Sequence, residues 1–209
     1  MPVKHGSRPY RSPSRDAAAE ATRSRIIAAA CALLAGGGKR PFSLESVARQ
    51  AKVTRLTVYN HFDSKRGLME AVFDDLARRG GLFELPAVFS DPDPERALRR
   101  LVTTFCRFWA MHRATLPNFR AAILADEEMA ASLKERAERR RQALTVLVGR
   151  MIGDRGRSND DLVDILFALT AFEMFEALCV RKRTVRSVET LIQSLVELAV
   201  GRYRVARRS

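Results

Sequence analysis

Residues 43–62 decide the fold, and they read SLESVARQAKVTRLTVYNHF. In the first part of this stretch Leu44, Val47, Ala48 and Ala51 recur at the spacing of a helix that is apolar on one side. A helix this short is not stable alone in water, so it must pack against its neighbours. The small side chain of Ala48 allows a second helix to approach closely. The stretch therefore predicts two short helices joined by a tight turn.

Polar residues are placed to cap both of these helices. Ser43 is expected to cap the first and Thr54 the second, because a side-chain oxygen can accept the free N–H groups of a first turn. If Val58 faces the core, Phe62 also points inward, since successive helical residues are about 100° apart. The outward face then carries Arg55, Leu56, Thr57, Tyr59, Asn60 and His61.

This outward face has no acidic residue, and most of its side chains are small or form hydrogen bonds. Such a face suits a helix in the major groove of DNA, where polar groups meet base edges and methyl groups meet thymine. The next helix begins at Asp63-Ser64-Lys65-Arg66. Its free N–H groups, its dipole and Lys65 together predict a phosphate clamp. The alternative interpretation is an ordinary pair of packed helices.

Residues 22–76 resemble the DNA-binding domain of the TetR family of bacterial repressors. The matching segments are TRSRIIAAACALLA, FSLESVARQAKVT and LTVYNHFDSKRGLMEAV. The resemblance implies that Ser43, Tyr59 and Lys65 contact phosphates. It also implies base contacts from Arg55, Leu56, Thr57, Asn60 and His61, and Thr54 completes the expected DNA-binding set. Only the base contacts would select the operator sequence, because phosphate contacts set position and register.

Two positions depart from the family pattern. Lys52 stands where the family usually has glycine, and a positive φ there would cost about 1 kcal/mol. Leu56 stands where a small residue is more usual. It either packs against a neighbouring helix or contacts a thymine methyl group.

The chain has 209 residues and a formal net charge of +13, which favours a polyanionic partner such as nucleic acid. Residues 1–15 are rich in Pro, Ser and Arg and are expected to form a disordered basic arm. The arm either enters a minor groove or attracts DNA without specificity. Helical patterns cover most of the remaining chain, at about 16–35, 44–51, 54–61, 64–80, 94–113, 118–125, 127–152, 160–181 and 185–204.

The fold is therefore expected to be all-α. A helix-turn-helix DNA-binding domain occupies residues 16–80, and a larger helical domain for ligand binding and dimerisation occupies 81–209. The segment at 160–181 is apolar on nearly every side, and that at 185–204 has an apolar stripe. Paired with a second copy, these two helices would form a four-helix interface of two-fold symmetry. A homodimer could read a palindromic operator.

Aromatic residues and methionines gather in the expected ligand domain. They describe either a pocket for a bulky apolar small molecule or an ordinary core. His112 could orient a ligand, but a lone histidine is more often a helix-end or surface residue. The candidate ligand-binding residues are Phe105, Trp109, Phe119, Ile123, Phe167, Thr170, Met174 and Phe175.

No catalytic motif, metal-ligand cluster or cofactor motif is recognised in the sequence. Cys31, Cys106 and Cys179 are interpreted as buried, reduced thiols. No segment approaches the about 20 apolar residues of a membrane span, so a cytoplasmic protein is expected. The sequence predicts a transcriptional regulator, most simply a repressor that a ligand releases from its operator. The alternatives are a ligand-promoted repressor, an activator, or a non-specific DNA-architectural protein.

Overall fold

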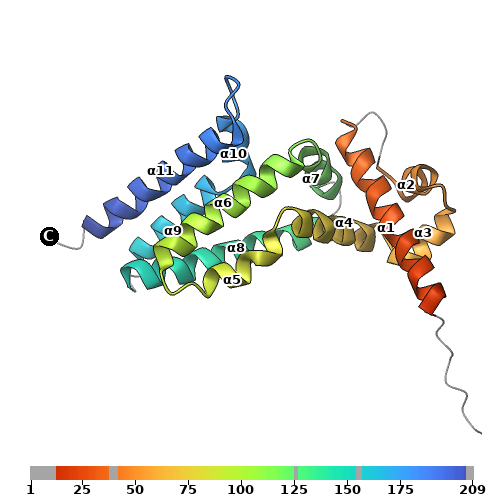
Figure 1. Ribbon diagram of the computed structural model, residues 1–209, viewed down its shortest axis with the longest axis horizontal. Coiled ribbons are helices and arrows are strands. Elements are labelled where there is room, and N and C mark those ends of the chain that lie inside the picture. Colours follow the sequence, from red (N-terminus) through yellow and green to blue (C-terminus); the bar gives the residue numbers. More distant parts are fainter. Residues whose placement is uncertain (1–12, 38–41, 125–126, 154–156, 206–209) are drawn as a thin grey trace, which may run out of the picture.

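The computed structural model describes residues 13–37, 42–124, 127–153 and 157–205. Throughout these residues the secondary structure is helical, with turns between the helices and no strand, so the prediction of an all-α fold is confirmed. The molecule is elongated, with α1 to α3 at one end and α11 running toward the other (Figure 1).

The N-terminal part contains four helices that the sequence predicts closely. They are α1 (Pro13–Ala35), α2 (Leu44–Ala51), α3 (Arg55–Phe62) and α4 (Lys65–Arg79). The expected arm is wrong for residues 13–15, which belong to the first turn of α1. Asp16 lies in the same turn, where a negative charge favours the helix dipole. The prediction for residues 1–12 lies outside the described residues.

The larger part begins with a short segment that the sequence did not predict, a 3-10 turn η1 (Leu82–Glu84) followed by α5 (Leu85–Phe89). The longer helices that follow agree with the predicted spans to within a few residues. They are α6 (Pro94–His112), α7 (Leu116–Leu124), α8 (Glu127–Ile152) and α11 (Val185–Val205). Pro117 lies in the first turn of α7 rather than before it, at a position where a missing N–H costs little.

The single helix predicted at 160–181 is wrong. The chain forms α9 (Arg157–Leu169), breaks, and continues as α10 (Phe172–Leu178). The break lies at Thr170 and Ala171: Ala171 is extended, with a ψ of 156°, and serves as the N-cap residue of α10. The Thr170 hydroxyl donates to the carbonyl of Leu166 at 2.8 Å, which competes with continued helix at this point.

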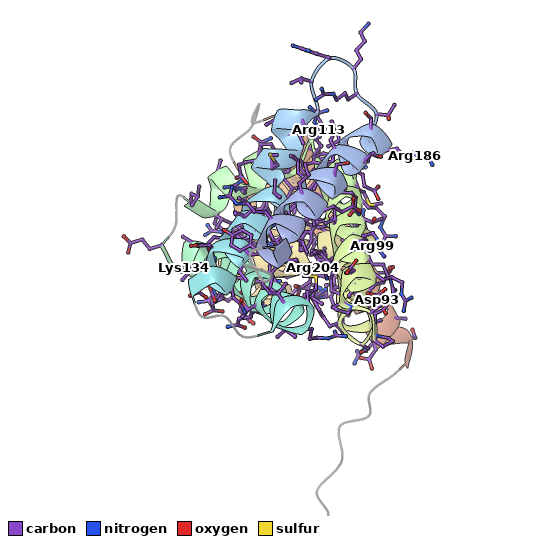
Figure 2. The ribbon with its side chains drawn as sticks, turned by 90° about the vertical axis from the view of Figure 1, so that its left-hand side faces the viewer. Asp93, Arg99, Arg113, Lys134, Arg186 and Arg204 are labelled. Atoms are coloured by element: carbon purple, nitrogen blue, oxygen red, sulfur yellow. The ribbon has the colours of Figure 1, made fainter. Side chains whose placement is uncertain are left out.

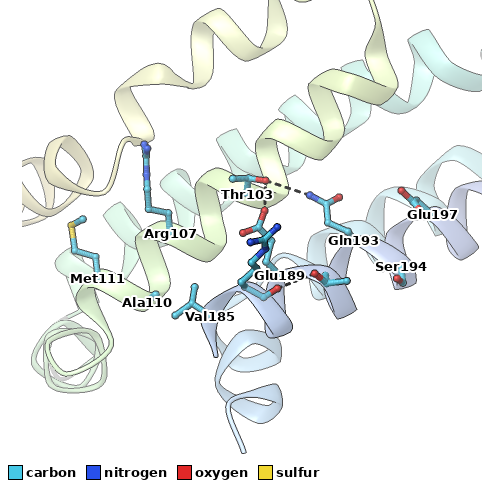
Figure 3. A pocket seen from close by; sticks show the side chains of 11 residues that line it. Thr103, Arg107, Ala110, Met111, Val185, Glu189, Gln193, Ser194 and Glu197 are labelled. Carbon is cyan, nitrogen blue, oxygen red and sulfur yellow. Dashed lines mark hydrogen bonds between the residues drawn. The ribbon is translucent and has the colours of Figure 1, made fainter. Parts of the chain in front are cut away.

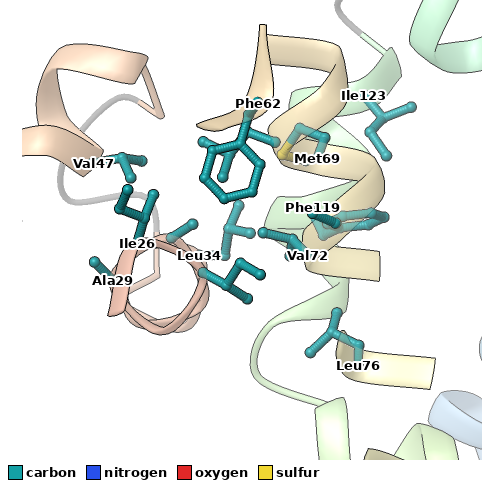
Figure 4. Close-up of a cluster of buried hydrophobic side chains, with 14 of the residues drawn as sticks. Ile26, Ala29, Leu34, Val47, Phe62, Met69, Val72, Leu76, Phe119 and Ile123 are labelled. Atoms are coloured by element: carbon teal, nitrogen blue, oxygen red, sulfur yellow. The ribbon is translucent and has the colours of Figure 1, made fainter. Parts of the chain in front are cut away.

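One buried cluster joins the N-terminal part to the larger part (Figure 4). Ile26 and Leu34 of α1, Val47 of α2 and Phe62 of α3 belong to the same cluster as Phe119 of α7. A second cluster fills the space among α6, α8, α9 and α11. Hydrophobic packing continues across the domain boundary predicted near residue 80. The division into two domains at this residue therefore stays a prediction.

Hydrogen bonds reinforce this joint on both sides of the boundary. Nε2 of His112, the last residue of α6, lies 2.9 Å from the carbonyl oxygen of Leu76 in α4. Asn118 Nδ2 in α7 donates to the carbonyl of Leu34 at the end of α1, at 2.7 Å. His112 is only 6% exposed, so its interpretation as a surface residue is wrong, although it does lie at a helix end.

The three cysteines are free thiols, and only Cys106 is fully buried, while Cys31 and Cys179 are half-buried. Burial raises the pKa of Cys106 to about 12, which keeps its thiol protonated at neutral pH. Over the described parts of the chain, no helix combines the length and apolarity needed to cross a membrane.

The contact between α6 and α4 predicts a pH-dependent stability. Burial is the main cause that lowers the pKa of His112 below its usual 6.5. The unfolded chain therefore binds more protons than the folded chain as the pH falls through 6.5, and the free energy of unfolding decreases. His112→Gln keeps a donor for the Leu76 carbonyl but cannot titrate.

Chemical denaturation from about pH 7.5 to about pH 5 should show a steeper loss of stability in the wild type than in His112→Gln. Parallel curves for the two proteins would contradict the assignment of this pH dependence to His112.

Candidate nucleic-acid interface

The start of α2 is fixed by a reciprocal pair of hydrogen bonds. Ser43 Oγ accepts the backbone N–H of Ser46 at 3.1 Å, and Ser46 Oγ accepts the backbone N–H of Ser43 at 3.0 Å. This capping box satisfies two free donors at the helix end. The expected role of Ser43 as N-cap is confirmed, whereas its partner Ser46 was missed. The spacing Ser-x-x-Ser is a weaker sequence signal than the usual Ser-x-x-Glu.

The turn between α2 and α3 has a left-handed residue at its corner. Lys52 adopts φ 55° and ψ 46°, so the positive φ whose cost was considered at this position is present. The backbone N–H of Val53 donates to the carbonyl of Ala48 at 3.0 Å, which closes the end of α2. The turn therefore places α3 at a fixed angle to α2 despite the unfavourable residue.

The inner face of α3 anchors it to the rest of the domain. Val58 is fully buried and Phe62 is 5% exposed, which confirms that both point inward. The guanidinium of Arg23 in α1 lies 5.2 Å from the centre of the Phe62 ring, a distance that allows a cation–π interaction. Within the nine residues from the cap to the end of α3, no carboxylate opposes an approaching phosphate.

The outer face of α3 presents most of the predicted DNA-binding residues to solvent. Thr54, Arg55, Leu56, Tyr59 and Asn60 are exposed. Leu56 is 66% exposed, so the interpretation that it packs against a neighbouring helix of this chain is wrong. The remaining interpretation is that the exposed Leu56 side chain contacts a thymine methyl group, and this stays a prediction.

The remaining predicted positions are partly engaged within the protein. Thr57 is half-buried, and its hydroxyl lies 2.8 Å from that of Thr54, whose Oγ1 also accepts the Thr57 backbone N–H at 3.0 Å. The cap role of Thr54 is thus confirmed. His61 and Lys65 are also half-buried. The structure therefore brings together one polar surface on α3, but it does not test the individual DNA contacts.

The start of α4 lies directly beside the end of α3. Ser64 Oγ accepts the backbone N–H of Gly67 at 3.0 Å, so Ser64 is the N-cap and Lys65 the first helical residue. A Cβ atom at Gly67 would lie 2.1 Å from the carbonyl oxygen of Phe62. Only glycine permits this approach without a shift of the backbone. Gly67 was missed because a glycine early in a helix carries no clear signal in the sequence.

The predicted ligand-binding residues divide between the two clusters. Phe119 and Ile123 lie in the cluster shared with α1 and α4, whereas Phe105 and Phe175 lie in the second cluster. Trp109 packs against both clusters. Phe167 and Met174 are half-buried and Thr170 is 3% exposed. Their role in binding stays a prediction.

An open groove of about 970 Å³ runs between α6 and α11 (Figure 3). Thr103 donates to Glu189 across it at 2.6 Å, and Gln193 bonds the backbone carbonyl of Arg99 at 2.8 Å. None of the eight predicted ligand residues lines this groove. In the described chain, no three His, Cys, Asp or Glu side chains are grouped so that they could hold a metal ion.

Charged side chains also cover the end of the molecule that is remote from α3 (Figure 2). Arg99, Arg186 and Arg204 are labelled there, and Arg204 forms an ion pair with Glu95 at 2.6 Å. The positive charge of the chain is thus spread widely. The chemistry and exposure of α3, rather than net charge, make this helix the candidate DNA-binding surface.

Comparisons with known proteins agree with this geometry. Residues 26–72 match the family described as bacterial regulatory proteins, tetR family. The chain is 28% identical to the HTH-type transcriptional repressor NicS of Pseudomonas putida over 77% of its length and 75% of the relative. It is 34% identical to the HTH-type transcriptional regulator EthR of Mycolicibacterium smegmatis, over 43% of its length and 42% of that relative.

Solved structures share the fold over most of the chain. A transcriptional regulator from Rhodococcus sp. superposes with a TM-score of 0.66 at 19% identity, covering 86% of this chain and 96% of that one. NalD of Pseudomonas aeruginosa, the secondary repressor of a multidrug efflux pump, gives a TM-score of 0.60 at 22% identity, covering 87% and 95%. At these identities the superpositions establish the fold.

The left-handed corner at Lys52 predicts that glycine is the more stable residue there. Lys52→Gly should raise the free energy of unfolding by about 0.5–1 kcal/mol, because glycine adopts positive φ without a Cβ clash. Lys52→Ala is the matched control, since it removes the charge but keeps the Cβ atom. Equal stabilisation by both variants in urea titrations would mean that charge, not backbone conformation, sets the effect.

Proposed function

Because this chain belongs to the TetR family of bacterial regulatory proteins and is a DNA-binding transcriptional regulator, we propose that it is a cytoplasmic repressor released from its operator by a small molecule. The observation that carries the proposal is the division of α3 into two faces. Val58 and Phe62 hold the helix against the core, while Arg55, Tyr59 and Asn60 are exposed. Such a helix can enter a major groove without losing its support.

The proposed repressor acts as a homodimer through α9, α10 and α11. Apolar side chains remain exposed on these helices: Leu198 is 70% exposed, Ile165 38% and Leu195 37%. Leu195 and Leu198 are three residues apart, so they share one face of α11. A two-fold pairing of this face would bury them and present two α3 helices to a palindromic operator.

The contacts between α6 and α4 support a route from ligand to DNA. Phe108 of α6 lies 6.3 Å from Phe73 of α4, ring centre to ring centre, and 4.8 Å from Trp109. The His112–Leu76 bond joins the same two helices. A ligand that repositions α6 would therefore move α4 and the adjoining α3. A coupling of about 1–3 kcal/mol would change operator affinity about 5–150-fold.

Two other functions predict different behaviour. A ligand-promoted repressor or an activator uses the same DNA surface, and the sign of the ligand effect on operator affinity distinguishes these from a released repressor. A non-specific architectural protein would bind all sequences about equally. The short polar face of α3 favours sequence reading over architectural binding.

The test of the proposal measures affinity for DNA upstream of the protein's own gene against scrambled DNA, over a series of salt concentrations. We expect a preference of about 10³-fold or more that persists near about 150 mM salt. Equal binding to both DNAs, to upstream fragments of neighbouring genes and to random pools would contradict a sequence-specific regulator.

Two substitutions separate base reading from phosphate binding. Asn60→Ala should cost about 1–3 kcal/mol at the preferred site and reduce the preference. Lys65→Ala should weaken binding to both DNAs alike and reduce the slope of log affinity against log salt by about 1. Lys134→Ala, an exposed lysine on α8, is the matched control and should change neither quantity. Identical effects of Asn60→Ala on both DNAs would argue against base reading.

The dimer surface has its own test. Leu198→Glu places a charge on the exposed apolar face of α11 and should raise the Kd of the dimer about 10-fold or more in sedimentation experiments. Thr190→Glu adds the same charge on the groove side of α11 and should leave the dimer intact. If Leu198→Glu has no effect on self-association, this face is not the interface.

A further inference from the structure

Arg140 of α8 is an unusual charge within the larger part of the molecule. Its guanidinium carbon lies over two aromatic rings, 4.0 Å from the centre of Phe167 and 5.3 Å from that of Phe105. Burial lowers its pKa to about 10, with a smaller contribution from the neighbouring charge of Arg141. Arg140 therefore remains protonated at neutral pH in surroundings that solvate it poorly.

No carboxylate among the described residues pairs with Arg140. Its Nη1 donates to the backbone carbonyl of Thr170 at 2.9 Å, and its Nε is buried without an acceptor. The adjacent Arg141 differs, since it is paired with Asp164 and lies 3.9 Å from Glu138. Removing a guanidinium from water is unfavourable when its only hydrogen-bond acceptor is one carbonyl oxygen. A negatively charged group bound beside it would offset that cost.

The break between α9 and α10 positions the backbone carbonyl of Thr170, which accepts the hydrogen bond from Arg140. The Thr170 carbonyl lies at this break and also accepts a hydrogen bond from Trp109 Nε1, at 3.1 Å. Arg140 Nη1 and Trp109 are thus fixed on one oxygen atom. This leaves the Nε–Nη2 edge of the guanidinium without an acceptor in the part of the chain that the structure describes. That edge is a fork that matches the two oxygens of a carboxylate.

Aromatic rings lie near this guanidinium. Phe105, Trp109 and Phe167 form what we call the aromatic box, and Phe105 stacks on Trp109 at 5.7 Å between ring centres. These walls are apolar and flat, so they favour an apolar or aromatic body over a hydrated inorganic ion. All three residues belong to the set that the sequence predicted for ligand binding, whereas Arg140 does not.

We propose that the effector is an organic carboxylate with an aromatic body, whose carboxylate pairs with the Nε–Nη2 edge of Arg140 inside the aromatic box. This proposal rests on the proposed function, because it names the chemical class of the ligand at the same domain. It replaces the expectation of a purely apolar ligand. Trp109 contacts Phe108, which in turn contacts Phe73 of α4. A ligand bound in the aromatic box would therefore contact the side chains that connect α6 to α4, the helix beside α3.

The experiment compares charged ligands with neutral ones of the same shape, using the full-length protein without DNA. Isothermal titration calorimetry would measure the binding of benzoate and 2-naphthoate beside benzamide and 2-naphthamide. At least one carboxylate should bind about 10-fold or more tightly than its amide. In Arg140→Gln this preference should disappear, because an amide side chain cannot pair with the carboxylate charge.

Two further variants test whether the loss of carboxylate preference in Arg140→Gln could come from damage to the fold. Arg140→Met fills a similar space with an apolar side chain and should also abolish the preference while the protein stays folded by circular dichroism. Arg139→Gln removes an exposed arginine beside it and should keep the wild-type ratio. The ratio of carboxylate to amide affinity would not change if Arg140 only supported the fold.

The outcomes separate this proposal from the function on which it rests. Failure of both carboxylates to bind at millimolar concentration, equal binding of the carboxylates and their amides, or an unchanged preference in Arg140→Gln would each overturn the Arg140 site. A protein that nevertheless prefers its operator DNA would retain the proposed function. Carboxylate binding without any operator preference would support the site and contradict the repressor.

Discussion

The helix-turn-helix depends on one constraint: α2 and α3 have eight residues each and cannot persist alone in water. Their stability comes from burying Val47 and Ala48 on one helix and Val58 and Phe62 on the other. Because each helix places its apolar residues on one side, the residues on its other side do not contribute to the buried core. The exposed face of α3 can therefore vary in sequence, and specificity can change, without loss of the fold.

The same burial ties DNA binding to the rest of the molecule. The cluster that holds α2 and α3 extends through α1 and α4 to Phe108 of α6 and Phe119 of α7. Close-packed side chains do not deform freely, so a displacement of α6 is passed to α4 rather than absorbed. The hydrogen bond from His112 to Leu76 adds a directional contact at this joint. The architecture thus suits a protein in which a ligand in one part alters the position of α3.

Periodicity and capping residues predicted most of the helices and both faces of α3, because those features depend on residues close together in sequence. The features that were missed depend on distant partners. The break at Thr170 contains no glycine or proline that would predict it from the sequence. The Thr170 carbonyl accepts hydrogen bonds from Trp109 and Arg140, which lie on two other helices. Arg140 is one of several arginines in the sequence of α8, and only the packing shows that its guanidinium lies over aromatic rings.

The central claim is that a supported, outward-facing α3 reads DNA sequence in a two-fold arrangement. Selection of bound sites from random double-stranded DNA by the wild-type protein tests it most directly. The account predicts enrichment of a palindrome whose half-sites are separated by about one helical turn or a multiple of it. Recovery of no consensus, or of a site without two-fold symmetry, would contradict it.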